Sequence, residues 1–481
     1  MNNNTLQHYR YQQLEQQLLD GIQQQRWRLG ERLPSIRTLC QEFSASKATV
    51  QHALQRLEAQ GLLEARPKSG FYVTLKPSAI AAPSTTGKLE PPRPVSVSEL
   101  LLDIMRRSAA FDILPERPSG DLPPGIVALN RSIGRALRRQ RGDDYLYYDD
   151  PAGMVSLREQ LQLSLSRRGC PLAIDDIAIT SGCQQALFLA LSACCQPGDV
   201  VAVESPGFYG VMQLLQQLQL RVIEIPAHPN SGLDIDAFES ALKQWPIRAC
   251  LVSPAFATPT GALMPEASRS RLLALAEQHD LAVIEDDIYA DTAFNSIPDP
   301  LKALEAGAVQ TAADPKKSRV ILCSSFSKSL SRDLRIGWVC GGRWHRQILH
   351  LKMITQLASS RSLQQGIADF MEDGHYAAHL KRQKYQLRNQ RDQLLGALRS
   401  WGNDHKISTP EGGLALWLEL PEQADTLALY PRALQQKVVI TPGPLFSASG
   451  KFSNCVRLSF AHDWNDHRQQ ALARFRGLVE G

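Results

Sequence analysis

A chain of 481 residues is too long for one ordinary hydrophobic core, so two or three domains are expected. A hydrophobic content of 43% and a charged content of 21% are typical of a folded globular protein and exclude an intrinsically disordered one. Residues 1–76 hold ten lysines and arginines against six acidic residues, so most of the formal net charge of +5 lies there, which hints at a nucleic-acid partner.

The chain shows no feature of a membrane or exported protein. The longest apolar run, Ala186–Cys195, is roughly half as long as a membrane span, and Met1–Gln7 lacks the basic and apolar regions of a signal peptide. Nine cysteines are scattered without a Cys-x-x-Cys pair, which argues against zinc sites and disulfides. We therefore expect a cytoplasmic protein without a bound metal.

The first segment, residues 1–76, predicts a small domain of helices followed by a strand pair. Apolar residues recur at helical spacing in 11–22, 36–43 and 47–57, and residues 62–73 read as two short strands around a turn. Polar and basic residues at the start of the third helix are typical of a recognition helix, with the strand pair as a wing. A helical domain with a merely solvated polar face explains the pattern equally well.

Residues 77–99 are rich in proline and serine and predict a linker. From residue 100 to 481, strand-like runs alternate with helical ones, which predicts a mostly parallel sheet covered on both faces. We expect a large subdomain over about 150–350 and a smaller α+β subdomain over about 360–481. The expected strands are 177–180, 200–203, 220–225, 249–252, 281–285 and 320–323, and the expected helices between them are 184–195, 210–218, 235–245 and 267–279.

One lysine, Lys328, follows the buried strand 320–323, at the kind of strand end where ligand sites of α/β folds collect. A lysine can form a Schiff base with an aldehyde, and the nearby serines and Arg335 suit a phosphate, so the stretch suggests pyridoxal 5′-phosphate (PLP). Ser325 and Lys328 also match the Ser-x-x-Lys motif of penicillin-binding enzymes, but the Ser-Asp-Asn and Lys-Thr-Gly motifs of those enzymes do not occur. A solvated surface lysine is the simplest alternative.

Other strand ends carry residues that fit the same ligand. Small residues at Thr180–Gln184 can hold an anion at a helix start, and Glu204–Gly210 offers an aromatic ring for stacking. Asp286 can bind a protonated pyridine nitrogen, Tyr289 can hydrogen-bond the ring hydroxyl, and Arg457 can bind a carboxylate. Each feature also has a structural explanation. Thr180–Gln184 can be a tight turn and the aromatic of Glu204–Gly210 a packing residue, while Asp286 can belong to an acidic surface turn and Arg457 to a salt bridge.

Residues 6–75 resemble the winged helix-turn-helix of the GntR regulators. The resemblance rests on Gly30–Arg37, Ser44–Thr49, Leu57–Leu62 and Lys68–Val73. It implies that DNA is contacted by Arg37, Ser46, Lys47, Thr49, Gln51, Lys68 and Gly70. The family usually has arginine where Lys47 stands, so this position keeps the charge but loses the bidentate guanidinium.

Residues 100–480 resemble fold-type I aminotransferases, and the whole chain resembles a MocR-type regulator. The expected fold is thus a mainly α winged helix-turn-helix joined to an α/β PLP-dependent transferase fold. The resemblance rests on Ser181–Leu187, Glu204–Phe208, Pro259–Gly261, Asp286–Tyr289, Ser325–Leu330, Leu334–Gly337 and Arg457–Phe460.

The resemblance implies a role for each site residue. Lys328 would form the internal aldimine, Asp286 would pair with the pyridine nitrogen and Tyr289 with the phenolic oxygen. Phe208 would stack on the ring, and Arg457 would bind the ligand carboxylate. Thr258 stands where relatives usually have an asparagine that donates to the phenolic oxygen, and Tyr148 resembles the tyrosine that reaches the neighbouring subunit's phosphate, which implies a homodimer. The phosphate would be held by Gly182, Cys183, Gln184, Ser325, Ser327 and Arg335.

These expectations describe a PLP-dependent transcriptional regulator that binds a DNA operator and senses an amino acid or amine by aldimine exchange at Lys328. One alternative is an active aminotransferase with an accessory DNA-binding module, and another is a direct sensor of PLP. Sustained catalysis is not the expected physiological role, although transaminase half-reactions are plausible chemistry for this set of residues.

Overall fold

The computed structural model describes residues 10–23, 26–27, 30–59, 62–66, 69–74, 89–95, 99–106, 112–115, 120–142, 146–308, 318–402 and 404–481. The chain forms two compact units, residues 1–81 with 389–403 and residues 82–388 with 404–481. Most of the predicted linker, 77–99, lies outside the described residues, so the proposed boundaries stay a prediction.

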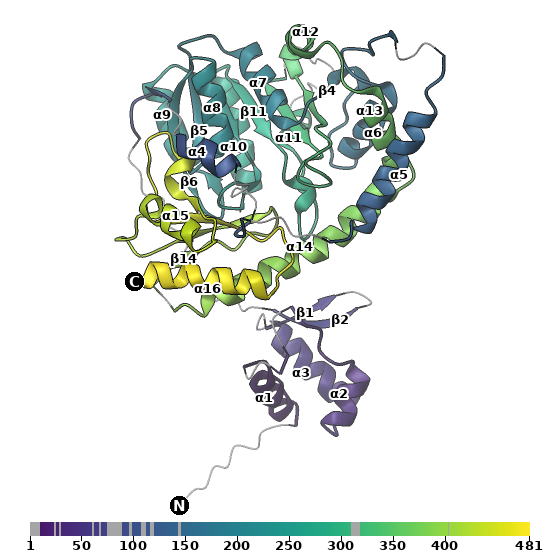
Figure 1. Cartoon of the computed structure of the whole chain (residues 1–481), viewed down its shortest axis with the longest axis vertical. Coiled ribbons are helices and arrows are strands. Elements are labelled where there is room, and N and C mark those ends of the chain that lie inside the picture. The colour runs from purple at the N-terminus through teal and green to yellow at the C-terminus, as the bar shows by residue number, and fades with distance from the viewer. Residues whose placement is uncertain are drawn as a thin grey trace, which may run out of the picture. The chain divides into compact units, whose positions relative to one another are not determined.

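The N-terminal unit contains the three helices and the strand pair that the sequence predicts. These are α1 (Arg10–Gln23), α2 (Ile36–Glu42), α3 (Lys47–Ala59), β1 (Leu63–Arg66) and β2 (Gly70–Val73), drawn in purple in Figure 1. Strands β1 and β2 pair antiparallel, with Leu63 opposite Val73. The apolar sides of the helices and the strand pair share one core around Leu18, Leu39 and Leu54.

The starts of α2 and α3 are capped by serine side chains. Ser35 Oγ accepts the N–H of Thr38 at 3.2 Å, and Ser46 Oγ accepts the N–H of Thr49 at 3.1 Å. These bonds satisfy backbone donors that a helix start leaves without an intrahelical partner. The cap at Ser46 therefore fixes where the turn ends and where α3, the helix that the sequence predicts for DNA recognition, begins.

The larger unit is built on a nine-stranded sheet that is mostly parallel, as predicted. Strands β5, β6, β8, β11 and β12 run parallel, whereas β13 runs antiparallel to both β12 and β4. The sequence reading missed β3, β7 and β13. The strands are β3 (Arg93–Pro94), β4 (Ile177–Thr180), β5 (Val200–Ser205), β6 (Arg221–His228), β7 (Gly232–Leu233), β8 (Ile247–Val252), β11 (Ala282–Asp286), β12 (Val320–Ser325) and β13 (Gly337–Cys340).

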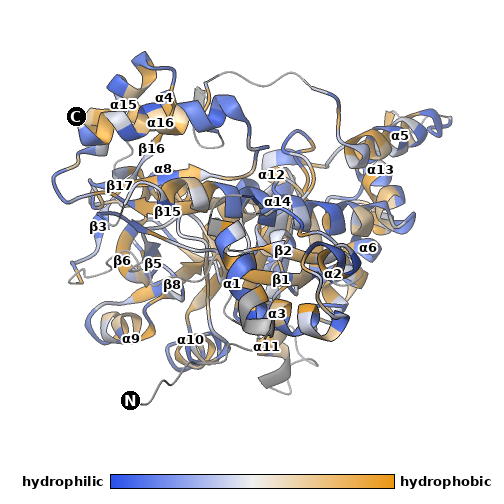
Figure 2. Ribbon diagram, turned by 90° about the horizontal axis from the view of Figure 1, so that it is seen from below, coloured by the Kyte–Doolittle hydropathy of each residue, from blue (hydrophilic) through white to orange (hydrophobic). Residues whose placement is uncertain are grey.

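Helices cover both faces of this sheet. In β5, Val201 and Val203 belong to one buried cluster, while Val200 and Ala202 belong to another, because successive side chains of a strand point to opposite faces. The first cluster includes residues of α7 (Cys183–Cys194), α8 (Tyr209–Gln217) and α12 (His345–Gln356), and the second includes residues of α9 (Ile235–Gln244), α10 (Glu266–Gln278) and α11 (Leu301–Ala308). Helices α9 and α10 show both hydropathy colours in Figure 2, as expected for helices with one buried side.

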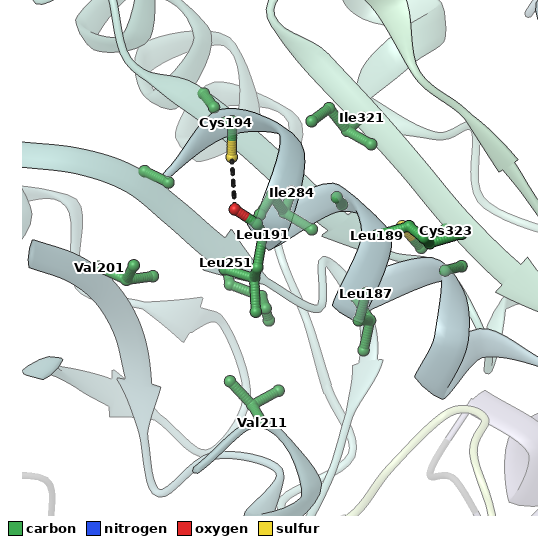
Figure 3. Packing of buried hydrophobic residues seen from close by; sticks show 14 of the residues in the cluster. Leu187, Leu189, Leu191, Cys194, Val201, Val211, Leu251, Ile284, Ile321 and Cys323 are labelled. Atoms are coloured by element: carbon green, nitrogen blue, oxygen red, sulfur yellow. Dashed lines mark hydrogen bonds between the residues drawn. The ribbon is translucent and has the colours of Figure 1, made fainter. Parts of the chain in front are cut away.

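Figure 3 shows the packing of α7 on the sheet. The helix is apolar around most of its circumference, with eight buried residues, because it lies inside the layer of helices. The contacts join Leu187, Leu189 and Leu191 of the helix to Val201, Leu251, Ile284 and Ile321 of the strands. This packing fixes the start of α7 at the carboxyl end of β4.

The remaining elements flank the sheet or form the smaller C-terminal part. A third buried cluster holds α5 (Pro124–Arg138), α6 (Val155–Ser166) and α13 (Arg361–Glu372). The predicted α+β subdomain is a four-stranded antiparallel sheet in the order β14, β15, β17, β16. The other elements are α4 (Glu99–Arg106), β9 (Ala255–Ala257), β10 (Ala262–Leu263), α14 (His375–Arg399), β14 (Lys406–Ile407), β15 (Ala415–Glu419), α15 (Thr426–Gln435), β16 (Thr441–Pro442), β17 (Cys455–Ser459) and α16 (Asp466–Glu480).

No helix among the described residues is both long and apolar enough to span a membrane.

A buried ion pair holds the end of β11, where site residues are expected. Arg168 and Asp287 are only 8% and 3% exposed. Two guanidinium nitrogens of Arg168 donate to the two Asp287 oxygens at 2.6 and 2.9 Å, and the same side chain donates to the carbonyl of Pro298. Since Asp287 follows Asp286, this pair fixes the backbone that carries the candidate pyridine partner.

Substituting Arg168→Leu is expected to lower the free energy of unfolding by about 3–5 kcal/mol, because it leaves the Asp287 carboxylate buried without its cation. Urea unfolding followed by near-ultraviolet circular dichroism measures the loss. Arg271 pairs with Asp236 and Glu239 on the exposed surface, so Arg271→Leu serves as the control and should leave the midpoint nearly unchanged. Equal effects of the two substitutions would contradict a special role for the buried pair.

Candidate functional site

Side chains from the carboxyl ends of several strands converge on one cavity of about 410 Å³. Carboxyl ends of parallel strands meet at one edge of a sheet, which is where α/β folds bind ligands. Of the predicted cofactor and carboxylate residues, eleven line this cavity: Cys183, Gln184, Phe208, Thr258, Asp286, Tyr289, Ser325, Ser327, Lys328, Arg335 and Arg457.

Lys328 lies in a well-defined turn after β12 and is not a solvated surface lysine. The turn is closed by the N–H groups of Leu330 and Ser331, which both donate to the carbonyl of Phe326. The Lys328 side chain reaches into the cavity, and its Nζ lies 6.0 Å from the centre of the Tyr289 ring. Burial lowers the pKa of the Lys328 amine to about 7.

Neighbouring charges add to this effect of burial. The positive charges of Arg332, Arg457 and Arg335 lower the pKa of Lys328 further, and the Asp286 carboxylate opposes them. A substantial fraction of the Lys328 amine is therefore neutral near neutral pH, and the neutral form is the nucleophilic one.

Asp286 ends β11 and is buried at the cavity. Burial raises its pKa to about 6, while hydrogen bonds from the Cys183 thiol and the Ile288 N–H, both at 3.3 Å to Oδ1, lower it. An ordinary carboxylate has a pKa near 4. Because burial disfavours the charged form of Asp286, a cationic partner stabilises this carboxylate more than it would stabilise an exposed one. A protonated ring nitrogen is such a partner.

The start of α7 and Arg335 form an anion-binding cradle. Gly182 precedes α7 with φ of 86°, and a Cβ at this position would lie 2.6 Å from Arg335 Nη2. Arg335 donates from Nη1 to Ser327 Oγ and from Nη2 to the carbonyl of Ser181, each at 3.2 Å. The N–H of Ser327 donates to Ser325 Oγ at 3.2 Å. A helix N-terminus, a guanidinium and two hydroxyls fit a phosphate.

Tyr289 and Thr258 form a hydrogen-bonded pair. Burial raises the pKa of the Tyr289 hydroxyl, and both the Arg457 charge and the hydrogen bond with Thr258 lower it. Thr258 therefore stands beside Tyr289 at the cavity wall. Both side chains line the cavity with Lys328, so both can reach a ring oxygen held there.

Arg457 extends from β17 in the smaller sheet and is buried. Its backbone lies opposite Trp417 on β15 and Thr441 on β16, which places it in the middle of that sheet. The side chain lines the same cavity as Lys328, so a carboxylate bound there can accept two parallel hydrogen bonds from it. The cavity is thus lined from both the nine-stranded and the four-stranded sheet.

Sequence reasoning missed several lining residues, namely Leu187, Tyr209, Gly210, Gln213, Ile288 and Arg332. Most are apolar or uncharged neighbours of predicted residues. Arg332 is different, because it adds a cation four residues after Lys328. The sequence shows an arginine four residues after Lys328, but hydrophobic periodicity does not predict the direction of a side chain on a loop.

Two groups of predicted residues lie elsewhere. Tyr148 is 80% exposed and does not line the cavity of its own chain. In the N-terminal unit, Arg37, Ser46, Lys47 and Gln51 are exposed, and Thr49 and Gly70 are half-buried. Lys68 lies outside the described residues.

Two family models match the chain, one for each unit of the predicted organisation. Residues 10–73 match the bacterial regulatory proteins of the gntR family. Residues 121–475 match aminotransferase class I and II. Together the matches confirm the predicted order of a winged helix-turn-helix followed by an aminotransferase-like domain.

Two HTH-type transcriptional regulators align with nearly the whole chain. YjiR, an HTH-type transcriptional regulator of Escherichia coli (strain K12), is 36% identical over 477 residues, which cover 98% of each chain. YdcR, a second such regulator of the same strain, is 33% identical over 477 residues, which cover 98% of this chain and 99% of YdcR.

A solved aminotransferase shares the fold of the larger unit. LysN, an α-aminoadipate aminotransferase from Thermus thermophilus complexed with N-(5′-phosphopyridoxyl)-L-leucine, is 26% identical. Its TM-score is 0.71, and the match covers 80% of this chain and 95% of LysN. Aminotransferases of class I and II depend on PLP, and the cradle at Gly182, the carboxylate of Asp286 and the amine of Lys328 fit that cofactor. The chain therefore belongs to the class I and II aminotransferase family and, through its gntR-family domain, to the MocR-type transcriptional regulators.

Proposed function

We propose that this protein binds a DNA operator through residues 1–76 and senses an amino acid or amine in its aminotransferase-like domain by aldimine exchange at Lys328. The observation that carries the proposal is the position of Lys328, which shares one cavity with Asp286, Arg335 and Arg457. These four charged groups match an aldehyde-bearing cofactor, its ring nitrogen, its phosphate and a ligand carboxylate.

Each part of PLP has a partner among the lining residues. Arg335, Ser325, Ser327, Cys183 and Gln184, with the turn at Gly182, would hold the phosphate; Asp286 would hold the pyridine nitrogen. Tyr289 and Thr258 would hold the phenolic oxygen, and Phe208 would cover the ring. Bound PLP supplies an aldehyde that condenses reversibly with amines.

The pKa of Lys328 supports its role as an exchangeable partner. An amine with a pKa near 7 is available for attack without a separate base, and it is also a moderate leaving group. Arg457 would hold the carboxylate of an incoming amino acid and so place its amine beside Lys328. Lys328 would hold the cofactor aldehyde until the amine of a ligand displaced it.

The exposed surface around Tyr148 supports a homodimer. Leu146, Tyr147 and Tyr148 are consecutive and more than half exposed, which is typical of an interaction surface when such residues cluster. Because Tyr148 does not reach its own cavity, we propose that it completes the phosphate site of a neighbouring subunit. A dimer would present two winged helices and read two half-sites of an operator.

The winged helix-turn-helix would contact DNA through α3 and the wing. Lys47 and Gln51 are exposed in the first turns of α3, and Arg37 is exposed on α2. Ser46 and Thr49 bond to each other at 2.8 Å as part of the cap of α3. We therefore assign Ser46 and Thr49 a positioning contribution, and Lys47 a phosphate contact. Gly70 and Lys68 belong to the proposed wing.

One observation favours a second function, sustained transamination. The lysine, aspartate, tyrosine and arginines that transamination needs all line the cavity. Product formation from an amino acid and a keto acid at a steady rate without DNA would support that function. A spectral change on amine binding without turnover supports the sensor.

Lys328→Ala is expected to abolish the visible absorption band of the covalently bound cofactor, because no other amine of the cavity takes its place. The measurement is the spectrum of purified protein with PLP, together with mass spectrometry after borohydride reduction, which should mark Lys328 in the wild type. The control is Lys243→Ala, which removes an exposed lysine of α9 paired with Glu239. A retained covalent band in Lys328→Ala would refute the proposal.

The rate at which cofactor-free protein takes up PLP is expected to rise with pH and to level off above a midpoint of about 7, because only the neutral Lys328 amine attacks. Arg332→Gln removes a positive charge that lowers this pKa, so its midpoint should move to higher pH. Stopped-flow absorbance across neutral pH measures both profiles. A wild-type midpoint near the ordinary lysine pKa of about 10.4 would contradict the assignment.

Lys47→Gln is expected to weaken binding to duplex DNA and to reduce the slope of log affinity against log salt concentration by about 1, as loss of one phosphate contact does. Fluorescence anisotropy with a labelled duplex at several salt concentrations measures both. Arg56→Gln is the matched control, since Arg56 lies on the same helix but pairs with Glu15 of α1 at 2.6 Å. An equal loss in both variants would argue against a specific contact by Lys47.

A further inference from the structure

We propose that the effector carries a second acidic group and that Arg332 recognises it, so that the effector class is an amino dicarboxylic acid. This inference rests on the proposed function, since it concerns the ligand of the same cavity. The inference assigns a role in ligand specificity to Arg332. This arginine lies four residues after Lys328 and was not among the site residues predicted from the sequence.

The cavity has an excess of positive charge. Its lining residues include four basic ones, Lys328, Arg332, Arg335 and Arg457, and one carboxylate, Asp286. Like charges in a shared cavity repel one another, and the charge of Arg457 lowers the pKa of Arg332. Bringing these groups together costs free energy in the empty protein, and bound anions recover it.

Arg335 is the cation that belongs to the proposed phosphate cradle. Arg335 donates to Ser327 Oγ and to the carbonyl of Ser181, and it packs against Gly182 at the start of α7. These contacts direct Arg335 toward the anion site at the helix N-terminus. Arg332 and Arg457 are the other two arginines that line the cavity.

Arg332 acts on the same groups as Arg457. Both charges lower the pKa of the Tyr289 hydroxyl, and both lower the pKa of the Tyr209 hydroxyl. All four side chains line the cavity. Because Arg332 lines the cavity and influences the same two tyrosines as Arg457, we infer that it faces the part of the cavity in which Arg457 would take the α-carboxylate.

The backbone that carries Arg332 is held on both sides. Before it, the Ser329 hydroxyl bonds the hydroxyl of Tyr376 at 2.8 Å. After it, the N–H of Asp333 donates to Ser331 Oγ, and Arg335 Nη1 donates to the carbonyl of Arg332 at 3.5 Å. A fixed loop pre-organises the arginine for a ligand, since less freedom is lost on binding.

Arg332 is exposed to solvent and also lines the cavity, so a ligand that enters from solvent can reach it. The protein atoms around the guanidinium lower its pKa by desolvation. The neighbouring carboxylate that raises the pKa of Arg332 is Asp112. Asp112 accepts two hydrogen bonds from Arg468 at 2.6 and 3.1 Å, so a ligand carboxylate competes with an acid that another arginine already binds.

The three arginines then match three anionic groups. Arg335 suits the cofactor phosphate, Arg457 the α-carboxylate and Arg332 a distal carboxylate. A guanidinium can donate to an amide carbonyl as well as to a carboxylate, but only the carboxylate adds the attraction between opposite charges and accepts two parallel hydrogen bonds. The cavity should therefore prefer glutamate or aspartate to glutamine or asparagine, which have the same shape without the charge.

The test titrates the PLP-loaded full-length protein with L-glutamate, L-aspartate, L-glutamine and L-asparagine and follows the visible spectrum. For the wild type, the half-saturating concentration of the preferred acid should be at least about tenfold below that of its amide. For Arg332→Gln, the ratio should fall to about one. The ratio is the readout because the change in the Lys328 pKa in this variant affects the acid and the amide titrations alike. Arg332→Lys should keep part of the preference, and Arg271→Gln, a surface control, should keep all of it.

The remaining outcomes contradict the inference in distinguishable ways. Equal affinity of the wild type for acid and amide overturns it, while the proposed function stands if either ligand changes the spectrum. Loss of bound PLP in Arg332→Gln would assign Arg332 to the phosphate and also overturn it. If no amino acid or amine changes the wild-type spectrum, the proposed sensing function fails and the inference fails with it.

Discussion

Three consecutive buried acids at the end of β11 are the constraint on which the site depends. Glu285, Asp286 and Asp287 are each at most 4% exposed, and burying carboxylates is costly unless each has its own partner. Glu285 accepts the N–H groups of Leu301 and Lys302 at the start of α11, and Asp287 binds Arg168. Asp286 alone faces the cavity.

This division of partners explains why Asp286 is available to a ligand. Its two neighbours are tied into the fold, so the backbone cannot turn to give Asp286 another partner. Burial and the charge of Asp287 raise the pKa of Glu285. Glu285 has a structural role, because it accepts backbone hydrogen bonds at a position shielded from water. The hydrogen bonds to Asp286 come from a thiol and a backbone N–H, and a protonated pyridine ring would add a cationic donor.

The order of the elements and most of the cavity could be predicted from the sequence, because apolar runs and short motifs are local. The same acids at 285–287 also show where local reasoning fails. An acidic turn on the surface was a fair alternative, since the partner Arg168 lies 119 residues away in sequence. The thiol contact from Cys183 to Asp286 spans 103 residues and was equally invisible. Side chains on loops, such as Arg332, depend on the turn that carries them.

The cavity also joins two sheets, and this arrangement is what the proposed sensing function requires. Lys328 follows β12 of the nine-stranded sheet, whereas Arg457 extends from β17 of the four-stranded sheet. A ligand held by both side chains binds more tightly when the two sheets are close than when they are apart. Differential affinity of this kind is what a ligand needs to shift a protein between conformations. A ligand with a second carboxylate would strengthen the preference, because Arg332 belongs to the Lys328 loop while Arg457 belongs to the smaller sheet.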